Sequence, residues 1–119
     1  MDERFQPGDF LFFQLEAGFA LLRLIGIDQR GENAVWHLTA YNDLFDSPES
    51  IETAIAKPEK LNIAIPHVAL TDRAFNSTQV ATVGNAPVTD AENQLISEWR
   101  ADANREISDR SIRLLLGFR

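Results

Sequence analysis

Three apolar, strand-like runs within the first 41 residues constrain this chain more than any other feature. They cover residues 10–15, 19–27 and 35–41, and aromatic, branched and other apolar residues dominate all three. Runs separated by short polar segments predict an antiparallel meander. So much apolar surface cannot lie flat in water. We therefore expect an α+β domain with a curved, mostly antiparallel sheet, an SH3-like partial barrel, covered by one or two helices.

Turn signals divide the meander into strands. Pro7-Gly8-Asp9 precedes the first run, and residues 16–18 can close a hairpin into the second. Gly26 is a candidate bulge within the second run. The polar residues 28–33 predict a loop before the third. Within that third run, alternation places Trp36, Leu38 and Ala40 on one face as core candidates and Val35, His37, Thr39 and Tyr41 on the other.

Helix capping signals appear at two later positions. Ser47-Pro48-Glu49 has the order of an N-cap, a first-turn proline and an acid, and predicts a short helix from Pro48 to about Ala56. Thr89 and Glu92 fit a capping box, which predicts an amphipathic helix that fades near Asn104, with Trp99 in its apolar stripe. This second helix is expected to cover the sheet.

The other segments carry weaker signals. Residues 61–65 and 79–83 are strand candidates, and Pro66 predicts the end of the first of them. Residues 71–75 can form one helical turn. The tail at 108–116 fits a last helix or a final strand equally well. A length of 119 residues predicts a single domain over residues 1–119.

The charge of the chain limits its partners. The formal net charge is −7, and residues 1–60 carry 11 acidic and 5 basic side chains. A nucleic acid partner is not expected, because its phosphates repel such a surface. The field favours a basic protein partner, although solubility alone explains an acidic surface. No signal peptide or membrane span is predicted, so we expect a cytoplasmic protein.

Specific catalytic motifs are missing from the sequence. There is no cysteine, no GxSxG nucleophile turn and no phosphate-binding glycine loop. The two histidines, His37 and His67, lie far apart and show no metal-ligand spacing. We therefore expect no cofactor, no metal site and no enzymatic activity.

Acidic residues follow the third strand at a spacing of three. Asp43, Asp46, Glu49 and Glu52 lead into the predicted short helix, where acids also serve as capping and solvated groups. The hypothesis that we favour is a non-catalytic protein-binding surface. Its acids would steer a partner, and its aromatic anchors would be Tyr41 and Phe45.

Two alternatives remain open. A small-molecule binder or enzyme could use a pocket at the barrel mouth lined by His37, His67 and Asp72. A self-associating scaffold would explain why three phenylalanines occur in residues 10–13, since they cannot all point inward from one strand; a helix packed over the strand would explain this too. The scaffold alternative predicts a homodimer.

Residues 5–24 resemble the start of a known family. Their Gly8-Asp9 turn, first strand, Gly18 hairpin and second strand are similar to the beginning of Imm26-type bacterial immunity proteins. The resemblance covers about a fifth of the chain and carries over no functional residue. It implies a cytoplasmic protein that binds and neutralises a toxin without catalysis. Nuclease toxins are commonly basic, which agrees with an acidic binder.

Overall fold

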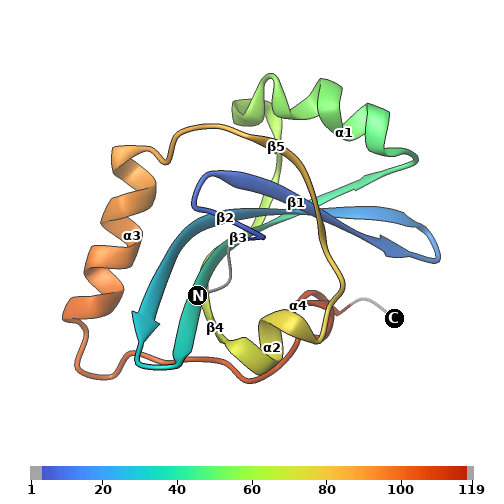
Figure 1. Ribbon diagram of the computed structural model, residues 1–119. Helices are drawn as coiled ribbons and strands as arrows, with labels where there is room; N and C mark the ends of the chain where they lie inside the picture. Colours follow the sequence, from blue (N-terminus) through green and yellow to red (C-terminus); the bar gives the residue numbers. More distant parts are fainter. Residues whose placement is uncertain (1–3, 118–119) are drawn as a thin grey trace.

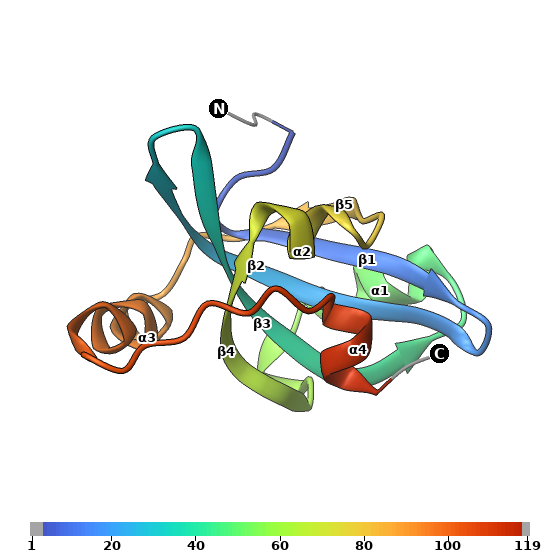
Figure 2. The ribbon, with the colours of Figure 1, turned by 90° about the horizontal axis from the view of Figure 1, so that it is seen from below.

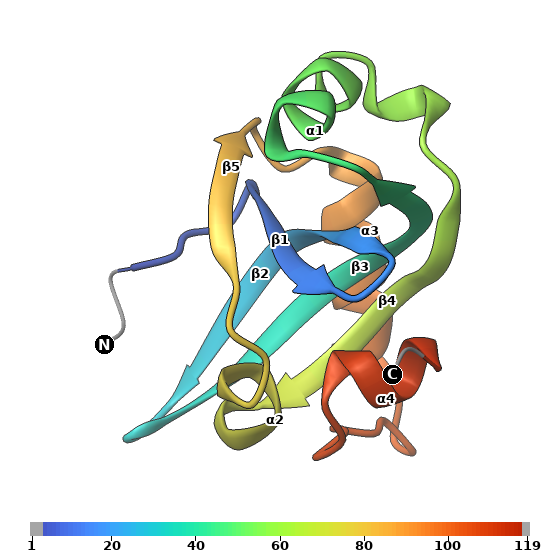
Figure 3. The ribbon, with the colours of Figure 1, turned by 90° about the vertical axis from the view of Figure 1, so that its right-hand side faces the viewer.

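The computed structural model describes residues 4–117, which form a five-stranded antiparallel sheet in the order β4-β3-β2-β1-β5 (Figure 1). The sheet is open, and Figure 3 shows that it is twisted and curved. The prediction of an α+β partial barrel is confirmed. The strands are β1 (Asp9–Leu15), β2 (Gly18–Arg30), β3 (Asn33–Phe45), β4 (Ile63–Thr71) and β5 (Ala81–Asn85).

Four short α-helices and one 3-10 turn accompany the sheet in residues 4–117, more than the one or two covering helices predicted. They are α1 (Pro48–Ile55), η1 (Pro58–Lys60), α2 (Asp72–Asn76), α3 (Asp90–Ala101) and α4 (Ile112–Leu116). Ser47 caps α1 and Thr89 caps α3, as the sequence predicts; the capping box predicted at Thr89 is present, and Ser47 forms one with Ser50 as well. The tail ends as helix α4, after Ser108 has formed a single parallel bridge to Leu70.

The connection between β2 and β3 is shorter than predicted. Residues 28–30 continue β2 as strand and pair with residues 33–35, so only Gly31 and Glu32 form the turn. Gly31 has a φ of 64°, which allows a tight turn without interrupting the ladder. The prediction of a six-residue loop is wrong, because polar side chains do not prevent the backbone of residues 28–30 from pairing with the next strand. The tip of this hairpin extends beyond the helices in Figure 2. Asp28 is a residue of strand β2.

Pro66 does not end its strand, contrary to the sequence prediction. β4 continues to Thr71 and lies at an edge of the sheet, where a missing N–H can be tolerated. The β3–β4 register shifts between Leu38 and Ala40, opposite Pro66, and the Thr39 hydroxyl donates to the Pro66 carbonyl at 2.8 Å. The strand therefore passes the proline at an irregularity and brings His67 alongside β3.

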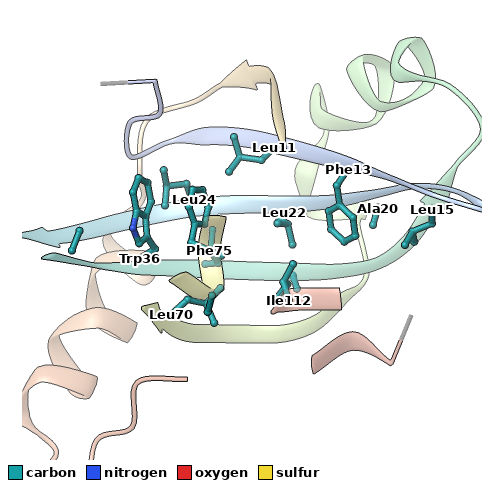
Figure 4. Close-up of a cluster of buried hydrophobic side chains, with 14 residues drawn as sticks. Leu11, Phe13, Leu15, Ala20, Leu22, Leu24, Trp36, Leu70, Phe75 and Ile112 are labelled. Carbon is teal, nitrogen blue, oxygen red and sulfur yellow. The ribbon is translucent and has the colours of Figure 1, made fainter. Parts of the chain in front are cut away.

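One face of the sheet carries the larger apolar core, which α2 and α4 cover (Figure 4). Trp36, Leu38 and Ala40 all belong to it, so the predicted core face is confirmed. The Trp36 ring stacks on Phe75 of α2, with centroids 4.0 Å apart. Burial of aromatic and branched side chains on this face is the main driving force available to the fold.

The opposite face is also buried, under α1 and α3. Near α1 it forms a second apolar cluster of Phe10, Leu21, Tyr41 and Ile51. Near α3 the backbone approaches closely at Gly26, where a Cβ atom would lie 2.5 Å from Ile96. The β2–β3 register shifts at Gly26, which confirms the predicted irregularity. None of the helices in residues 4–117 has the length and hydropathy needed to cross a membrane.

Candidate functional site

The most unusual site is a buried polar network under α3, centred on His37. This histidine is 0% exposed. Its Nδ1 lies 2.8 Å from Nε2 of His67, and its Nε2 lies 3.2 Å from a carboxylate oxygen of Asp28. The guanidinium of Arg100, in α3, donates to both oxygens of that carboxylate. Its Nε lies 3.2 Å from the oxygen that also faces His37. The result is a continuous chain of hydrogen bonds from Arg100 through Asp28 and His37 to His67.

Four elements position these groups, and three local features make their meeting possible. Asp28 is available because β2 extends past the predicted loop. The irregularity at Gly26 sets the register between β2 and β3, and Gly26 pairs with His37. His67 reaches His37 because β4 continues through Pro66. The helix α3 then supplies Arg100 from the exposed side.

The hydrogen-bond pattern defines the tautomer of each ring. Asp28 is held as a carboxylate by Arg100, so the His37 Nε2 facing it must carry the hydrogen and donate. In a neutral His37, Nδ1 is then an acceptor, and the hydrogen in the bond to His67 belongs to Nε2 of His67. Nδ1 of His67 is consequently left with a lone pair. The Asp28 carboxylate therefore sets the tautomers of both rings.

The electrostatics agree with a neutral histidine pair beside an ionised Asp28. The pKa of His67 is lowered to about 4, mainly by burial and also by the neighbouring His37. Burial also lowers the pKa of His37, against the opposing effect of Asp28. The hydrogen bond from Arg100 is the main reason that the pKa of Asp28 lies below its ordinary value. At neutral pH the network contains one carboxylate, one guanidinium and two uncharged imidazoles.

Trp99 covers the two histidines. Its ring meets His37 edge-on at a centroid distance of 4.9 Å and His67 at 6.3 Å. Arg30 and Arg105 lie over the indole, and its Nε1 donates to the Glu106 carbonyl at 2.9 Å. Trp99 is a packing residue, as the sequence suggested, but it packs on imidazole rings rather than on the apolar core.

A groove of about 780 Å³ opens beside the exposed end of the network. It lies between β4, the end of α3 and the segment that leads to α4, and both charge signs line it. Its polar lining includes His67, Asp102, Arg105, Glu106, Ser108 and Arg110. His67 is therefore the member of the network that a molecule in this groove can contact.

Asp72 does not join the histidines. It opens α2, and its two oxygens accept hydrogen bonds from Nε1 of Trp36 at 2.7 Å and from the backbone N–H of Ala34 at 2.8 Å. Trp36 belongs to the apolar face, so Asp72 lies across the sheet from His37. It lines a separate hollow of about 520 Å³ together with Phe5 and Trp36. The structure brings His37 and His67 into contact and places Asp72 on the other face of the sheet.

The predicted acidic surface divides into exposed and occupied residues. Asp46, Glu49 and Glu52 are exposed, and none of them forms an ion pair within residues 4–117. Asp43 is half-buried and accepts hydrogen bonds from the backbone N–H and the side-chain amide of Asn62, at 2.7 and 3.0 Å. Three carboxylates are therefore available to a partner.

The two predicted aromatic anchors differ in access. Tyr41 is buried in the cluster under α1, and burial raises the pKa of its hydroxyl to about 12. Phe45 is half-buried and packs against the same cluster. Leu44, beside it in the strand, is 44% exposed. Tyr41 supports this surface from below, whereas Phe45 reaches it; Leu44 pairs with Ala20 of the larger core and lies on the opposite face of the sheet.

A second polar cluster, centred on Arg23, went unrecognised in the sequence. Arg23 is buried, binds both oxygens of Glu92 at 3.1 Å, and donates to the carbonyls of Gly8 and Pro87. The capping-box position of Glu92 and the charge of Arg23 within an apolar run were visible signals. No comparable signal separates Asp28 or Arg100 from other surface charges, because their meeting depends on tertiary structure.

Within residues 4–117, no three His, Asp or Glu side chains form a group able to hold a metal ion. Comparison with family models, with curated proteins and with solved structures finds no match for this chain. The chemistry of its own residues is therefore what bears on its function.

Proposed function

We propose that this chain is a non-catalytic protein-binding domain that engages a basic partner through the surface around α1. The observation that carries this proposal is the set of three exposed, unpaired carboxylates of Asp46, Glu49 and Glu52. Charges of one sign without intramolecular partners attract an oppositely charged protein and orient its approach. The resemblance of residues 5–24 to immunity proteins suggests a basic toxin in the bacterial cytoplasm as the partner.

The apolar neighbour of these acids supports a contact surface rather than a merely solvated one. Phe45, directly before Asp46, is half-buried and packs against the apolar cluster under α1. Protein interfaces commonly combine an apolar centre with a charged rim. Phe45 would form the centre, and the three carboxylates would form the rim. Tyr41, which the sequence suggested as an anchor, would act only by supporting Phe45.

The experiment compares partner capture by the wild type and by a charge-reversed variant. The variant carries Asp46→Lys, Glu49→Lys and Glu52→Lys. A control makes the same change in net charge at exposed acids elsewhere, with Glu32→Lys, Asp90→Lys and Glu98→Lys. Proteins captured from bacterial lysate at low and moderate salt are identified by mass spectrometry, and the affinity of each purified partner is then measured.

The proposal expects a basic partner whose affinity falls at least tenfold in the α1 variant and far less in the control. Its affinity should also weaken as salt rises, because the contacts are charged and exposed. Equal affinities for wild type and α1 variant, or equal losses in both variants, would remove the assignment of this surface.

A further inference from the structure

The buried network ends at Nδ1 of His67, an atom without a hydrogen-bond partner in the described part of the chain. This nitrogen carries a lone pair. Over that part of the chain, the buried side-chain polar atom without a partner is Oγ1 of Thr78, so Nδ1 of His67 must reach solvent. Its residue lines the groove of about 780 Å³. A solvent-accessible acceptor therefore belongs to a residue on the wall of a space large enough for a small molecule.

The network strengthens this acceptor. A donor that binds Nδ1 draws electron density from the His67 ring and polarises its Nε2–H toward His37. The positive charge that builds on His37 meets the carboxylate of Asp28. Arg100 keeps that carboxylate ionised and fixed. The same bonds also hold the ring in one tautomer and one orientation, so a ligand does not have to order them.

Cationic groups supply a second recognition element in the groove. Arg105 is held in place over Trp99 and by a hydrogen bond from its Nη1 to the Asp102 carbonyl. Arg110 is exposed, and its guanidinium has no partner within residues 4–117. Guanidinium groups bind carboxylates with two parallel hydrogen bonds. Of the groove acids, Asp102 already accepts the backbone N–H of Asn104 at 2.8 Å.

We propose that the groove beside His67 binds a small carboxylic acid that carries a hydrogen-bond donor on the carbon next to its carboxylate. The donor, a hydroxyl or an amine, binds Nδ1 of His67, and the carboxylate binds Arg110 with Arg105 nearby. This site lies beside α3 and β4. It is independent of the proposed partner-binding surface around α1, so either proposal can fail without the other.

Lactate and propionate test the proposal, because they share a three-carbon skeleton and a single negative charge and differ in one hydroxyl. Binding to the full chain at pH 7 is followed through the imidazole nitrogens of ¹⁵N-labelled protein. Before ligand is added, the spectrum should show His67 protonated at Nε2 and unprotonated at Nδ1. Lactate should shift the Nδ1 signal and bind about tenfold more tightly than propionate, the value of roughly one good hydrogen bond.

Three variants assign the contacts. His67→Gln should bring lactate and propionate to within about twofold of each other. Arg110→Gln should weaken both acids by a similar factor, because it removes a carboxylate contact only. Lys57→Gln removes an exposed charge near α1 and should leave both affinities unchanged.

Two results would overturn the proposal. One is a His67 protonated at Nδ1 in the free protein. The other is equal binding, or no binding, of the two acids by the wild-type chain while its amide spectrum shows the native fold. A low-affinity result that still separates lactate from propionate supports the site, since lactate is among the smallest ligands of the class.

Discussion

Helices α1 and α3 cover the same face of the sheet but bury opposite kinds of chemistry. Under α1 lies the apolar cluster of Phe10, Leu21, Tyr41 and Ile51. Under α3 the sheet presents Arg23 and His37, both buried and both engaged in polar contacts. Both helices begin with a capping box, so the difference lies in what each one covers.

This difference shows how burial constrains the two regions unequally. An apolar contact under α1 tolerates small shifts, since its energy depends on area and packing rather than direction. Each polar group under α3 needs a partner at the correct distance, because an unpaired buried charge is costly. The α3 region is therefore the more exactly arranged part of the molecule. It is also where His67 lines a groove, while α1 directs its charges outward.

The largest effect should come from removing the charge of Arg23. In Arg23→Met, the Glu92 carboxylate and the carbonyls of Gly8 and Pro87 lose their partner. We expect the free energy of unfolding to fall by about 3–5 kcal/mol, measured by urea unfolding with circular dichroism. The exposed Arg110→Met is the control and should change stability by less than about 0.5 kcal/mol. A loss below about 1 kcal/mol for Arg23→Met would show that the polar contacts of Arg23 do not constrain the α3 region.

The matching change under α1 is Ile51→Ala. Ile51 is 0% exposed, so the truncation leaves a cavity between α1 and the sheet. We expect a loss of about 2–4 kcal/mol in the same unfolding experiment. The same substitution at Ile63, which is 54% exposed, should cost well under 1 kcal/mol. Equal losses at both positions would contradict the description of α1 as an apolar cover.

Acidification should separate the two regions by a smaller amount. The pKa of His67 is lowered to about 4 and that of His37 is also lowered, so the unfolded chain, with histidines near about 6.5, binds more protons. The stability contributed by the neutral pair is present above pH 6.5 and is lost as the pH falls toward 4. The free energy of unfolding should therefore decrease between pH 7 and pH 5.

Two variants show whether this pH dependence comes from the α3 region. His67→Gln should reduce the slope of stability against pH over that range, because one of the two shifted groups is gone. Ile51→Ala should be less stable at every pH but keep the wild-type slope. An unchanged slope in His67→Gln would mean that the histidine pair is not neutral in the folded protein.

The smallest effect tests the feature that the two helices share. Ser47 and Thr89 each accept a backbone N–H in the first turn of their helix. Ser47→Ala and Thr89→Ala should each lower the free energy of unfolding by about 1 kcal/mol. Because the caps lie in separate regions, the double variant should show the sum of the two losses within about 0.5 kcal/mol. A larger loss in the double variant would indicate that the regions are energetically coupled.

The sequence by itself determined the elements that depend on near neighbours. The capping residues Ser47 and Thr89, the strand alternation around Trp36 and the irregularity at Gly26 all act within a few residues, so their signals can be read directly. The curved sheet followed because three apolar strands must be covered. The acidic surface at Asp46, Glu49 and Glu52 also needed only sequence, since charged side chains on a helix start are normally exposed.

Tertiary structure alone decided the burial of the second face and everything that depends on it. Tyr41 became a core residue because α1 folds over it, and His37 became fully buried because α3 does the same. His67 contacts His37 only because β4 continues past Pro66 at the edge of the sheet. Asp72 instead accepts a hydrogen bond from Trp36. These partners lie 30 or more positions apart in the chain. Contacts at that separation are set by the packing of whole elements, which no local pattern encodes.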